Sequence, residues 1–210
     1  GNALAECLQN AGHIVSFDLQ DPDLDIILLA VVMPKMSVFS YGEQDIFRYL
    51  QRVNDRAIVV HRVNECDERK GTDIVNLALR RANLCADHTV FVSSWLRTLH
   101  LAQGMPAREC SVILNGSDRA TFHSVGHQPW SHREPLRIVT HHWSGGWMKG
   151  FDIYQRLDEL LGEEQYRSRY QFTYVGNLPD GFRFRNATHK SPLYGIALAD
   201  ELRSHHVYLT

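Results

Sequence analysis

Short apolar runs alternate with helix-like segments along the first half of the chain. The runs typical of buried strands are residues 13–17, 26–32, 57–60, 89–92 and 110–114. Between them, segments near residues 44–53, 73–85 and 94–103 place apolar side chains at helical spacing, and a further helix precedes the first run. Continuously apolar strands separated by helices are typical of parallel sheets that carry helices on their faces. We therefore predict an α/β fold with a mostly parallel, doubly wound sheet.

The helices of this half carry end signals and apolar faces. Gly12 suits the position just after the C-terminus of the first helix, and Ser93 or Ser94 suits the N-cap of the helix that follows residues 89–92. The residues expected to face the core are Leu4, Cys7, Leu8, Ala11, Ile46, Leu50, Val53, Ile74, Ala78 and Cys85.

The second half begins a new strand–loop–helix unit. Residues 136–140 read as a strand, Gly145 and Gly146 occupy the following loop, and a helix is expected from about Asp152, burying Ile153, Leu157, Leu160 and Leu161. Lys149 precedes that helix. Unpaired N–H groups and a lysine at a helix N-terminus favour phosphate, so this unit predicts an anion site. Two adjacent glycines are also consistent with an ordinary flexible turn, and that alternative stays open.

An Asn-Gly turn separates the two halves. After the apolar run 111–114, Asn115 and Gly116 can take the positive φ that ends a strand abruptly, and Asp118 follows. Residues 124–135 have little apolar periodicity, which is typical of a linker. We predict a first domain over residues 1–123, a linker over 124–135 and a second domain over 136–210, with Asn115, Gly116 and Asp118 as interdomain residues.

Composition excludes several classes of function. The formal net charge of −2 over 210 residues does not provide the basic excess that nucleic-acid binding needs. Neither G-x-G-x-x-G nor G-x-x-x-x-G-K-[ST] occurs, which disfavours dinucleotide and P-loop chemistry, and no apolar run reaches the roughly 20 residues of a membrane-spanning helix. The four cysteines are scattered and read as core residues in a reducing compartment. Twelve histidines show no metal-ligand spacing, so no metal site is expected.

The polar segment 61–72 (HRVNECDERKGT) follows a predicted strand. Ligands of doubly wound sheets bind at the carboxyl ends of the strands, and His61 is expected directly at such an end. The segment is rich in groups that bind hydroxyls or transfer protons. A solvated loop is the alternative, since charge-rich segments are usually exposed.

Together these segments resemble the family-4 glycosyltransferases of GT-B fold. The similarity extends over essentially the whole chain and is closest to a bacterial branch, whose members carry segments like residues 61–72 and 140–144 (THHWS). The resemblance implies two Rossmann-like domains of GT-B type that face each other across a cleft. It also implies transfer of a sugar from a nucleotide-diphosphate-sugar donor to an acceptor hydroxyl, with retained anomeric configuration, without a metal and without a cofactor beyond the nucleotide sugar as co-substrate.

The resemblance also implies roles for individual residues. His61 matches a histidine near the donor sugar and the acceptor, Lys149 matches the lysine that neutralises the donor diphosphate, and residues 174–177 match the strand and loop beside the nucleobase. The expected catalytic residues are His61, Glu65 and Asp67, with Glu65, Asp67 and Glu68 able to orient or deprotonate the acceptor hydroxyl. The expected donor-binding residues are His142, Ser144, Gly145, Gly146, Lys149, Gly176 and Asn177.

The chain departs from the family pattern in two respects. Family members place an arginine five or six residues before the lysine, where this chain has Trp143 and Ser144, so His142 or another group would have to supply the second cationic contact. The family's paired glutamates should follow the strand at 207–209, where the sequence stops, and the chain opens in a helix rather than a strand. We therefore expect a fragment with an incomplete second domain that is poorly active alone, and an open sheet edge beside residues 13–17 that invites self-association.

Two other functions remain open: a nucleotide-sugar epimerase or hydrolase of the same fold, and a non-catalytic sugar-nucleotide-binding protein. The expected partners are a nucleotide-sugar donor and a glycan, lipid-linked or small-molecule acceptor, with no nucleic acid and no transmembrane segment. We expect a cytoplasmic location, with peripheral attachment to the inner membrane face as a further option.

Overall fold

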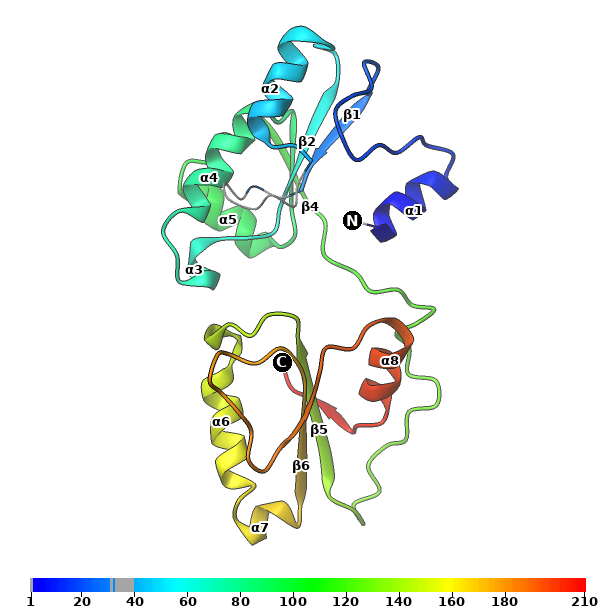
Figure 1. The fold of residues 1–210 in the computed structure, drawn as a ribbon, viewed down its shortest axis with the longest axis vertical. Helices are drawn as coiled ribbons and strands as arrows, with labels where there is room; N and C mark the ends of the chain where they lie inside the picture. Colours follow the sequence, from blue (N-terminus) through cyan, green and yellow to red (C-terminus); the bar gives the residue numbers. More distant parts are fainter. Residues whose placement is uncertain (1, 31, 33–39) are drawn as a thin grey trace. The chain divides into compact units, whose positions relative to one another are not determined.

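The computed structural model describes residues 2–30, 32 and 40–210, and the chain divides into two compact units, Gly1–Asn115 and Gly116–Thr210 (Figure 1). Each unit has its own four-stranded sheet, and every strand pairing in both sheets is parallel. The predicted α/β class with parallel strands is confirmed, and it is compatible with a Rossmann-like fold.

The division falls earlier in the chain than the sequence predicts. Residues 116–123, which we assigned to the first domain, and the expected linker 124–135 belong to the second unit. The reason is packing: Phe122 lies against the core formed by Val139, Val175 and Leu198, and Arg203 donates a hydrogen bond from Nη1 to the Thr121 carbonyl at 3.2 Å. This segment has no apolar periodicity, and it is held to the second unit by the Phe122 ring and by backbone contacts.

The first unit alternates strands and helices in chain order, and its strands are arranged β1-β2-β3-β4. Its elements are α1 (Asn2–Asn10), β1 (Ile26–Leu29), α2 (Glu43–Arg52), β2 (Ile58–Val63), α3 (Asp67–Lys70), α4 (Val75–Ala82), the 3₁₀ turn η1 (Asn83–Cys85), β3 (His88–Phe91), α5 (Ser94–Ala102) and β4 (Glu109–Val112).

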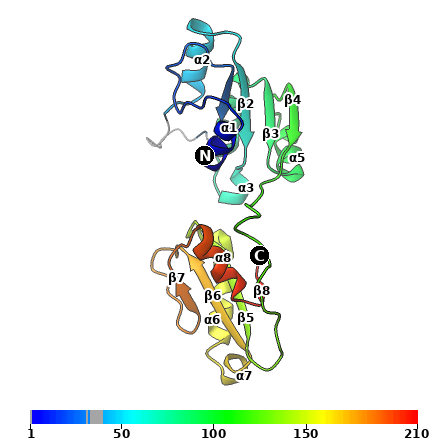
Figure 2. The same cartoon turned by 90° about the vertical axis from the view of Figure 1, so that its right-hand side faces the viewer.

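One face of the first sheet carries the core of this unit. Alternate residues of β2, namely Val59, His61 and Val63, are buried on that face beneath α2, α4 and α5 (Figures 1 and 2). Helix α1 lies on the opposite face, where Ile26 remains 62% exposed. Burial alternates along β2, so only every second side chain of this strand packs into the core.

Several predicted elements of the first unit differ from the structure. Residues 13–17 do not form a strand: Ile14 is 96% exposed, and the Asp18 carboxylate accepts a hydrogen bond from the Gln20 N–H, a local turn that competes with strand pairing. The strand expected over 26–32 ends at Leu29, and Val31 lies outside the described residues. The open edge is therefore not beside a strand at 13–17, and among the described residues β1 and β4 are the two edge strands of this sheet.

The predicted inward faces are also partly wrong. Helix α1 buries Ala5, whereas the expected face is exposed. Val53 and Ile74 are exposed since each lies just outside its helix rather than within it. The exposed residues of the α1 face are Leu4, Cys7, Leu8 and Ala11.

The helix-end signals are confirmed. Gly12 follows α1 with a φ of +91°, which a glycine adopts without strain. Ser93 is the N-cap of α5, and its Oγ accepts a hydrogen bond from the Leu96 N–H at 3.1 Å.

The second unit is a three-layer arrangement. Its elements are β5 (Leu136–His142), the 3₁₀ turn η2 (Trp147–Lys149), α6 (Phe151–Leu160), α7 (Glu164–Arg167), β6 (Tyr170–Gly176), β7 (Thr188–Lys190), α8 (Gly195–Arg203) and β8 (Val207–Tyr208). Helix α6 covers one face of the sheet and α8 the other (Figures 1 and 2). The α6 face holds an aromatic core of Phe151, Tyr154, Phe172 and Tyr174, closed by Leu161.

The strand at 136–140 and the helix near Asp152 are confirmed, with β5 extending to His142 and α6 beginning at Phe151. Ile153, expected in the core, is exposed, because the buried face of α6 runs through Phe151, Tyr154 and Asp158 instead.

The strand order β7-β6-β5-β8 places a topological switch point between β5 and β8. The chain leaves β5 through α6 to reach β6 on one side, and later returns through α8 to β8 on the other side. Ligands of open α/β sheets bind outside the carboxyl ends of the strands at such a point. The carboxyl end of β5, with His142 and the loop after it, is therefore the place in this unit where topology favours a ligand.

Within the described ranges, no helix combines the length and the apolar composition needed to cross a membrane. Over the same residues, no three His, Cys, Asp or Glu side chains come together as metal ligands would. All four cysteines are free; Cys66 and Cys85 are buried as expected, whereas Cys7 is exposed on α1 and Cys110 is half-buried.

Candidate functional site

The loops after β5 and β6 are locked together at the carboxyl edge of the second sheet. The Asn177 Nδ2 donates a hydrogen bond to the Trp143 carbonyl at 2.6 Å, which ties one loop to the other. A Cβ at Gly145 would overlap the Leu178 carbonyl, so only glycine fits there. The flexible-turn alternative for Gly145 is therefore wrong: this glycine permits close backbone packing.

Gly176 is constrained even more strongly. It ends β6 with a φ of +144°, a conformation that side chains other than glycine rarely adopt, and a Cβ there would overlap the His142 carbonyl oxygen. Its own carbonyl accepts a hydrogen bond from His189 Nε2 at 2.8 Å. The end of β6 thus fixes the end of β5, which carries His142.

Lys149 lies where the sequence predicts, directly before a helix N-terminus. It ends the turn η2, Gly150 follows with a φ of +91°, and α6 begins at Phe151. The first helical hydrogen bond runs from the Tyr154 N–H to the Gly150 carbonyl, so the preceding N–H groups have no acceptor inside the helix. The half-buried Lys149 therefore comes two residues before a helix that begins with unpaired N–H groups and the positive end of the helix dipole.

His142 and Ser144 complete this edge. The His142 Nε2 lies 2.8 Å from the Tyr154 hydroxyl. Burial, the nearby Lys149 charge and His141 lower the pKa of His142, so the ring is largely neutral at neutral pH. The idea that His142 supplies the second positive charge is therefore not supported. Ser144 is exposed, and its Oγ accepts a hydrogen bond from the Gly146 N–H at 3.2 Å.

Asn177 has a structural task in this arrangement. Its side-chain amide holds the Trp143 carbonyl, and its backbone carbonyl accepts the Tyr174 hydroxyl at 2.8 Å. The side-chain amide of Asn177, a residue expected to bind the nucleotide sugar, is thus used to shape the loop.

In the first unit, the position expected for His61 is wrong. Strand β2 continues through Val63, so His61 lies within the strand rather than at its end, and its side chain is fully buried. Its Nδ1 lies 2.7 Å from the Asn83 Oδ1, which also accepts the Thr89 hydroxyl at 3.0 Å. Burial lowers the pKa of His61 to about 4, against the opposing effect of the Asn83 hydrogen bond. His61 is therefore a neutral core residue whose side chain is not accessible to solvent.

The Asp67 carboxylate also has a structural role. Its carboxylate accepts hydrogen bonds from the Thr72 hydroxyl at 2.6 Å and from the N–H groups of Val75 and Asn76, both at 2.9 Å. Burial alone raises the pKa of the Asp67 carboxyl, but the hydrogen bonds from Thr72, Asn76 and Val75 outweigh it and hold that pKa below its usual value. The carboxylate closes the N-terminus of α4, and three hydrogen bonds hold it in that structural role.

Glu65 and Glu68 differ from Asp67. The half-exposed Glu65 carboxylate pairs with Lys70 at 3.2 Å, while Glu68 accepts hydrogen bonds from Asn76 Nδ2 at 3.1 Å and from Gln103 Nε2 at 2.7 Å. The Asn76 hydrogen bond lowers the pKa of Glu68. Of the expected catalytic residues His61, Glu65 and Asp67, only Glu65 is not buried, and the neighbouring Glu68 is exposed.

Replacing Asp67 with Ala should destabilise the first unit by about 2–4 kcal/mol, because the two buried N–H groups of Val75 and Asn76 and the Thr72 hydroxyl lose a charged acceptor. Replacing Glu65 with Ala should cost less than about 1 kcal/mol, since it removes a partly exposed ion pair. Urea denaturation of both variants measures the difference. Equal losses of stability would contradict the structural role of Asp67.

The expected interdomain residues lie at the boundary but not in the predicted conformation. Asn115 Oδ1 accepts a hydrogen bond from Arg62 Nη2 at 2.6 Å, and Asp118 accepts one from the Thr121 hydroxyl at 2.6 Å. Neither Asn115 nor Gly116 has the expected positive φ. Strand β4 ends at Val112, two residues before this turn begins, so no abrupt reversal is needed there.

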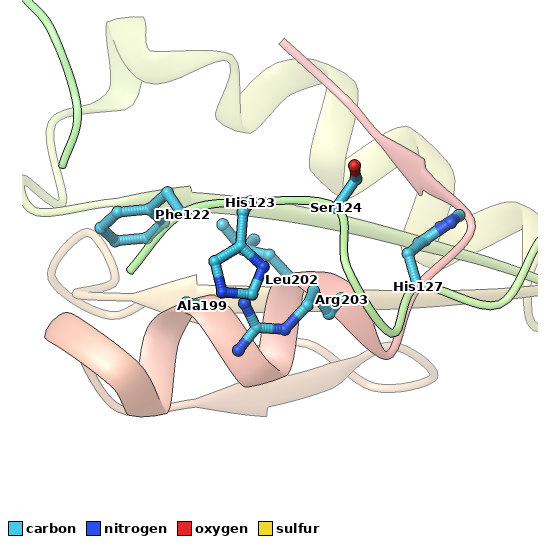
Figure 3. A pocket seen from close by; sticks show the side chains of 7 residues that line it. All are labelled: Phe122, His123, Ser124, His127, Ala199, Leu202 and Arg203. Carbon is cyan, nitrogen blue, oxygen red and sulfur yellow. The ribbon is translucent and has the colours of Figure 1, made fainter. Parts of the chain in front are cut away.

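The hollows of the second unit lie elsewhere. A cavity of about 320 Å³ separates the segment 122–127 from α8, with Phe122 and His123 facing Leu202 and Arg203 (Figure 3). A second, of about 550 Å³, is lined by residues that include Arg137, Asp200 and Arg203. Neither shares a residue with the loops after β5 and β6. Because the first is largely apolar and neither has a phosphate-binding loop, we place the candidate site at the carboxyl edge of β5.

Tyr154 is the residue of this edge that sequence reasoning missed. It lies one helical turn after Gly150 on the same side of α6 as the buried Phe151. That spacing directs its side chain toward the sheet, and the spacing is the signal that could have identified it.

No protein-family model matches the chain, and no curated protein sequence matches it significantly.

Proposed function

We propose that the chain belongs to a retaining, metal-independent glycosyltransferase, with the second unit binding the diphosphate of a nucleotide-sugar donor. The observation that carries this proposal is Lys149, placed directly before the N-terminus of α6 at the switch point of a parallel sheet. The resemblance to family-4 glycosyltransferases supports the same assignment. In this proposal the two units correspond to the acceptor-side and donor-binding domains of a GT-B enzyme.

The chemistry follows from charge placement. When the glycosidic bond to the donor breaks, negative charge accumulates on the departing diphosphate. A lysine ammonium and backbone N–H groups that are already oriented stabilise that charge without a metal. Gly146 allows the phosphate to approach the backbone, since it presents no side chain and a Cβ there would meet only the Ser144 Oγ at 3.4 Å.

The acceptor side carries a revised assignment. Because His61 is buried and Asp67 caps α4, neither is proposed to touch the acceptor. Glu65 remains the candidate base or orienting group for the acceptor hydroxyl, since it is half-exposed and its Lys70 ion pair is easily exchanged.

Replacing Lys149 with Ala should weaken the binding of a nucleoside diphosphate by about 10- to 100-fold, as expected for the loss of a charge-assisted phosphate contact. Isothermal titration of the 210-residue chain with adenosine, guanosine and uridine diphosphates measures the effect. The matched control is Arg167→Ala, which removes one positive charge from α7 before β6, at the amino end of the same sheet. Equal affinities of both variants would refute the phosphate role of Lys149.

A non-catalytic sugar-nucleotide-binding protein is the second candidate. The observation that favours it is the structural use of both His61 and Asp67, which leaves the first unit with fewer free catalytic groups. Release of nucleoside diphosphate from a panel of nucleotide sugars, with and without Glu65→Gln, distinguishes the two. Turnover that depends on Glu65 supports the transferase, and tight binding without turnover supports the alternative.

A further inference from the structure

We propose that Tyr154 is a positioning residue that holds the neutral His142 ring as its Nδ1–H tautomer, so that Nδ1 offers an N–H to a phosphate oxygen. The part that concerns phosphate rests on the proposed function, whereas the tautomer does not.

The hydroxyl of Tyr154 lies between two polar partners. It is 2.8 Å from His142 Nε2 and 3.4 Å from Thr140 Oγ1. Thr140 is fully buried and Tyr154 nearly so, and the His142 and Tyr154 rings stack with centroids 5.9 Å apart at 30°. A Cβ at Gly150 would press on the Tyr154 hydroxyl at 3.3 Å, so that glycine leaves just enough room for it.

The directions of these hydrogen bonds follow from what each atom can donate. The Thr140 hydroxyl donates its single proton to the Leu209 carbonyl at 2.8 Å, because a carbonyl can only accept. The Thr140 oxygen is therefore only an acceptor toward Tyr154. Tyr154 also has one proton, and the 2.8 Å contact with His142 is much shorter than the 3.4 Å contact with Thr140.

Donation from Tyr154 to His142 fixes the tautomer. An Nε2 that accepts carries no proton, so a neutral imidazole must bear its proton on Nδ1. The competing pattern has Nε2–H donating to Tyr154, which then donates across 3.4 Å to Thr140. That pattern keeps the 2.8 Å contact but reverses its direction, and it adds only the long 3.4 Å contact to Thr140. The reversed hydrogen bond is the weaker one, because a phenol O–H is a better donor than a neutral imidazole N–H and an imidazole nitrogen is a better acceptor than a phenol oxygen.

A neutral N–H donor suits this edge of the sheet. A second cation beside Lys149 would be repelled, and burial and the Lys149 charge keep the pKa of His142 below its ordinary value. A neutral donor adds a hydrogen bond to phosphate without that repulsion. The chain thus has a donor two residues before Ser144, near the position where the family pattern places an arginine.

The first test reads the tautomer directly. The 210-residue chain is labelled with ¹⁵N-histidine, and long-range ¹H–¹⁵N correlations give the protonation of each ring nitrogen at pH 8. The His142 signals are identified by their loss in His142→Gln. We expect protonated Nδ1 and unprotonated Nε2 in the unmodified chain. An Nε2–H tautomer there overturns the proposal, and this reading needs no variant of Tyr154.

The second test isolates the hydroxyl. Tyr154→Phe should shift His142 toward the Nε2–H tautomer, whereas Tyr174→Phe should leave it unchanged, because the Tyr174 hydroxyl donates to the Asn177 carbonyl rather than to His142. Both variants keep the aromatic ring in the same core. An unchanged tautomer in a folded Tyr154→Phe chain contradicts the positioning role.

The third test concerns the phosphate. Titration with inorganic pyrophosphate should give an affinity for Tyr154→Phe that is about 3- to 10-fold weaker than for Tyr174→Phe. If Lys149→Ala weakens binding and Tyr154→Phe does not, the phosphate contact from Nδ1 is wrong while the proposed function stands. If the tautomer is as expected but neither pyrophosphate nor nucleoside diphosphates bind the unmodified chain, the proposed function fails and the positioning of His142 by Tyr154 stands.

Discussion

Replacing Gly176 with Ala is expected to destabilise the second unit by more than about 3 kcal/mol. The backbone of the alanine would have to adopt a φ of +144°, which costs about 1–3 kcal/mol for a residue with a Cβ. The same Cβ would overlap the His142 carbonyl oxygen, and relieving that overlap separates the ends of β5 and β6. The substitution should therefore weaken both the fold of this unit and the loop that carries Lys149.

Two other glycines separate the causes. Gly181 also has a positive φ, +75°, but a Cβ there meets open space, so Gly181→Ala should cost about 1–2 kcal/mol. Gly116 has neither constraint, and Gly116→Ala should be close to neutral. Urea unfolding followed by the near-ultraviolet signal of the aromatic core measures all three. A Gly176→Ala chain as stable as Gly181→Ala would show that the close approach of the two loops is not rigid.

The first unit is expected to lose roughly 3 kcal/mol of stability as the pH falls from about 6.5 to about 4 through the titration of His61. The pKa of His61 is lowered from its ordinary 6.5 to about 4 by burial, and that difference corresponds to roughly this free energy. The folded state therefore binds the proton less readily than the unfolded state within this window. The stabilising contribution is present above pH 6.5 and is lost as the pH falls through the window.

His61→Gln should flatten the pH dependence, because the amide can bond to Asn83 but does not titrate. The matched control is His13→Gln, which removes an exposed histidine from the same unit and should leave the slope unchanged. Denaturant unfolding at pH 7.5, 6, 5 and 4 gives the comparison. If His61→Gln and the unmodified chain lose stability in parallel, the buried neutral histidine is not the cause.

Much of the fold could be predicted from apolar spacing. The strands around Val59, Val90 and Val139 stand out because parallel strands are buried and so read as mostly apolar runs between helices. The helix ends at Gly12 and Ser93 were predictable because local backbone chemistry decides them. These features depend on residues that are close in the sequence.

The errors arise where tertiary packing decides. Residues 13–17 have an apolar pattern, yet a turn at Asp18 prevents the strand. His61 was expected at an exposed strand end because β2 was predicted three residues too short, and those three residues place it in the core. The sequence of a strand does not reveal whether a polar side chain has a buried hydrogen-bond partner, as His61 has in Asn83.

The candidate site was predictable in part for the same reason. Lys149 follows from the local order of strand, glycine loop and helix. The roles of Asp67 and Asn177 could not be predicted, because their partners lie in another helix or loop. Tyr154 and Thr140 meet His142 only once α6 packs on β5. Polar residue types thus do not reveal which side chains hold the loops in place, whereas the hydrogen bonds of the structure do.

The most direct test of the central claim is a map of backbone amide shifts in the 210-residue chain during titration with the nucleoside diphosphate that binds best. We expect saturable changes at Gly145, Gly146 and residues 149–153, where the loop after β5 meets the N-terminus of α6. Saturable changes confined to the cavity between Phe122 and Arg203, or to the first unit, would contradict the claim, as would the absence of saturable binding by any of the three diphosphates.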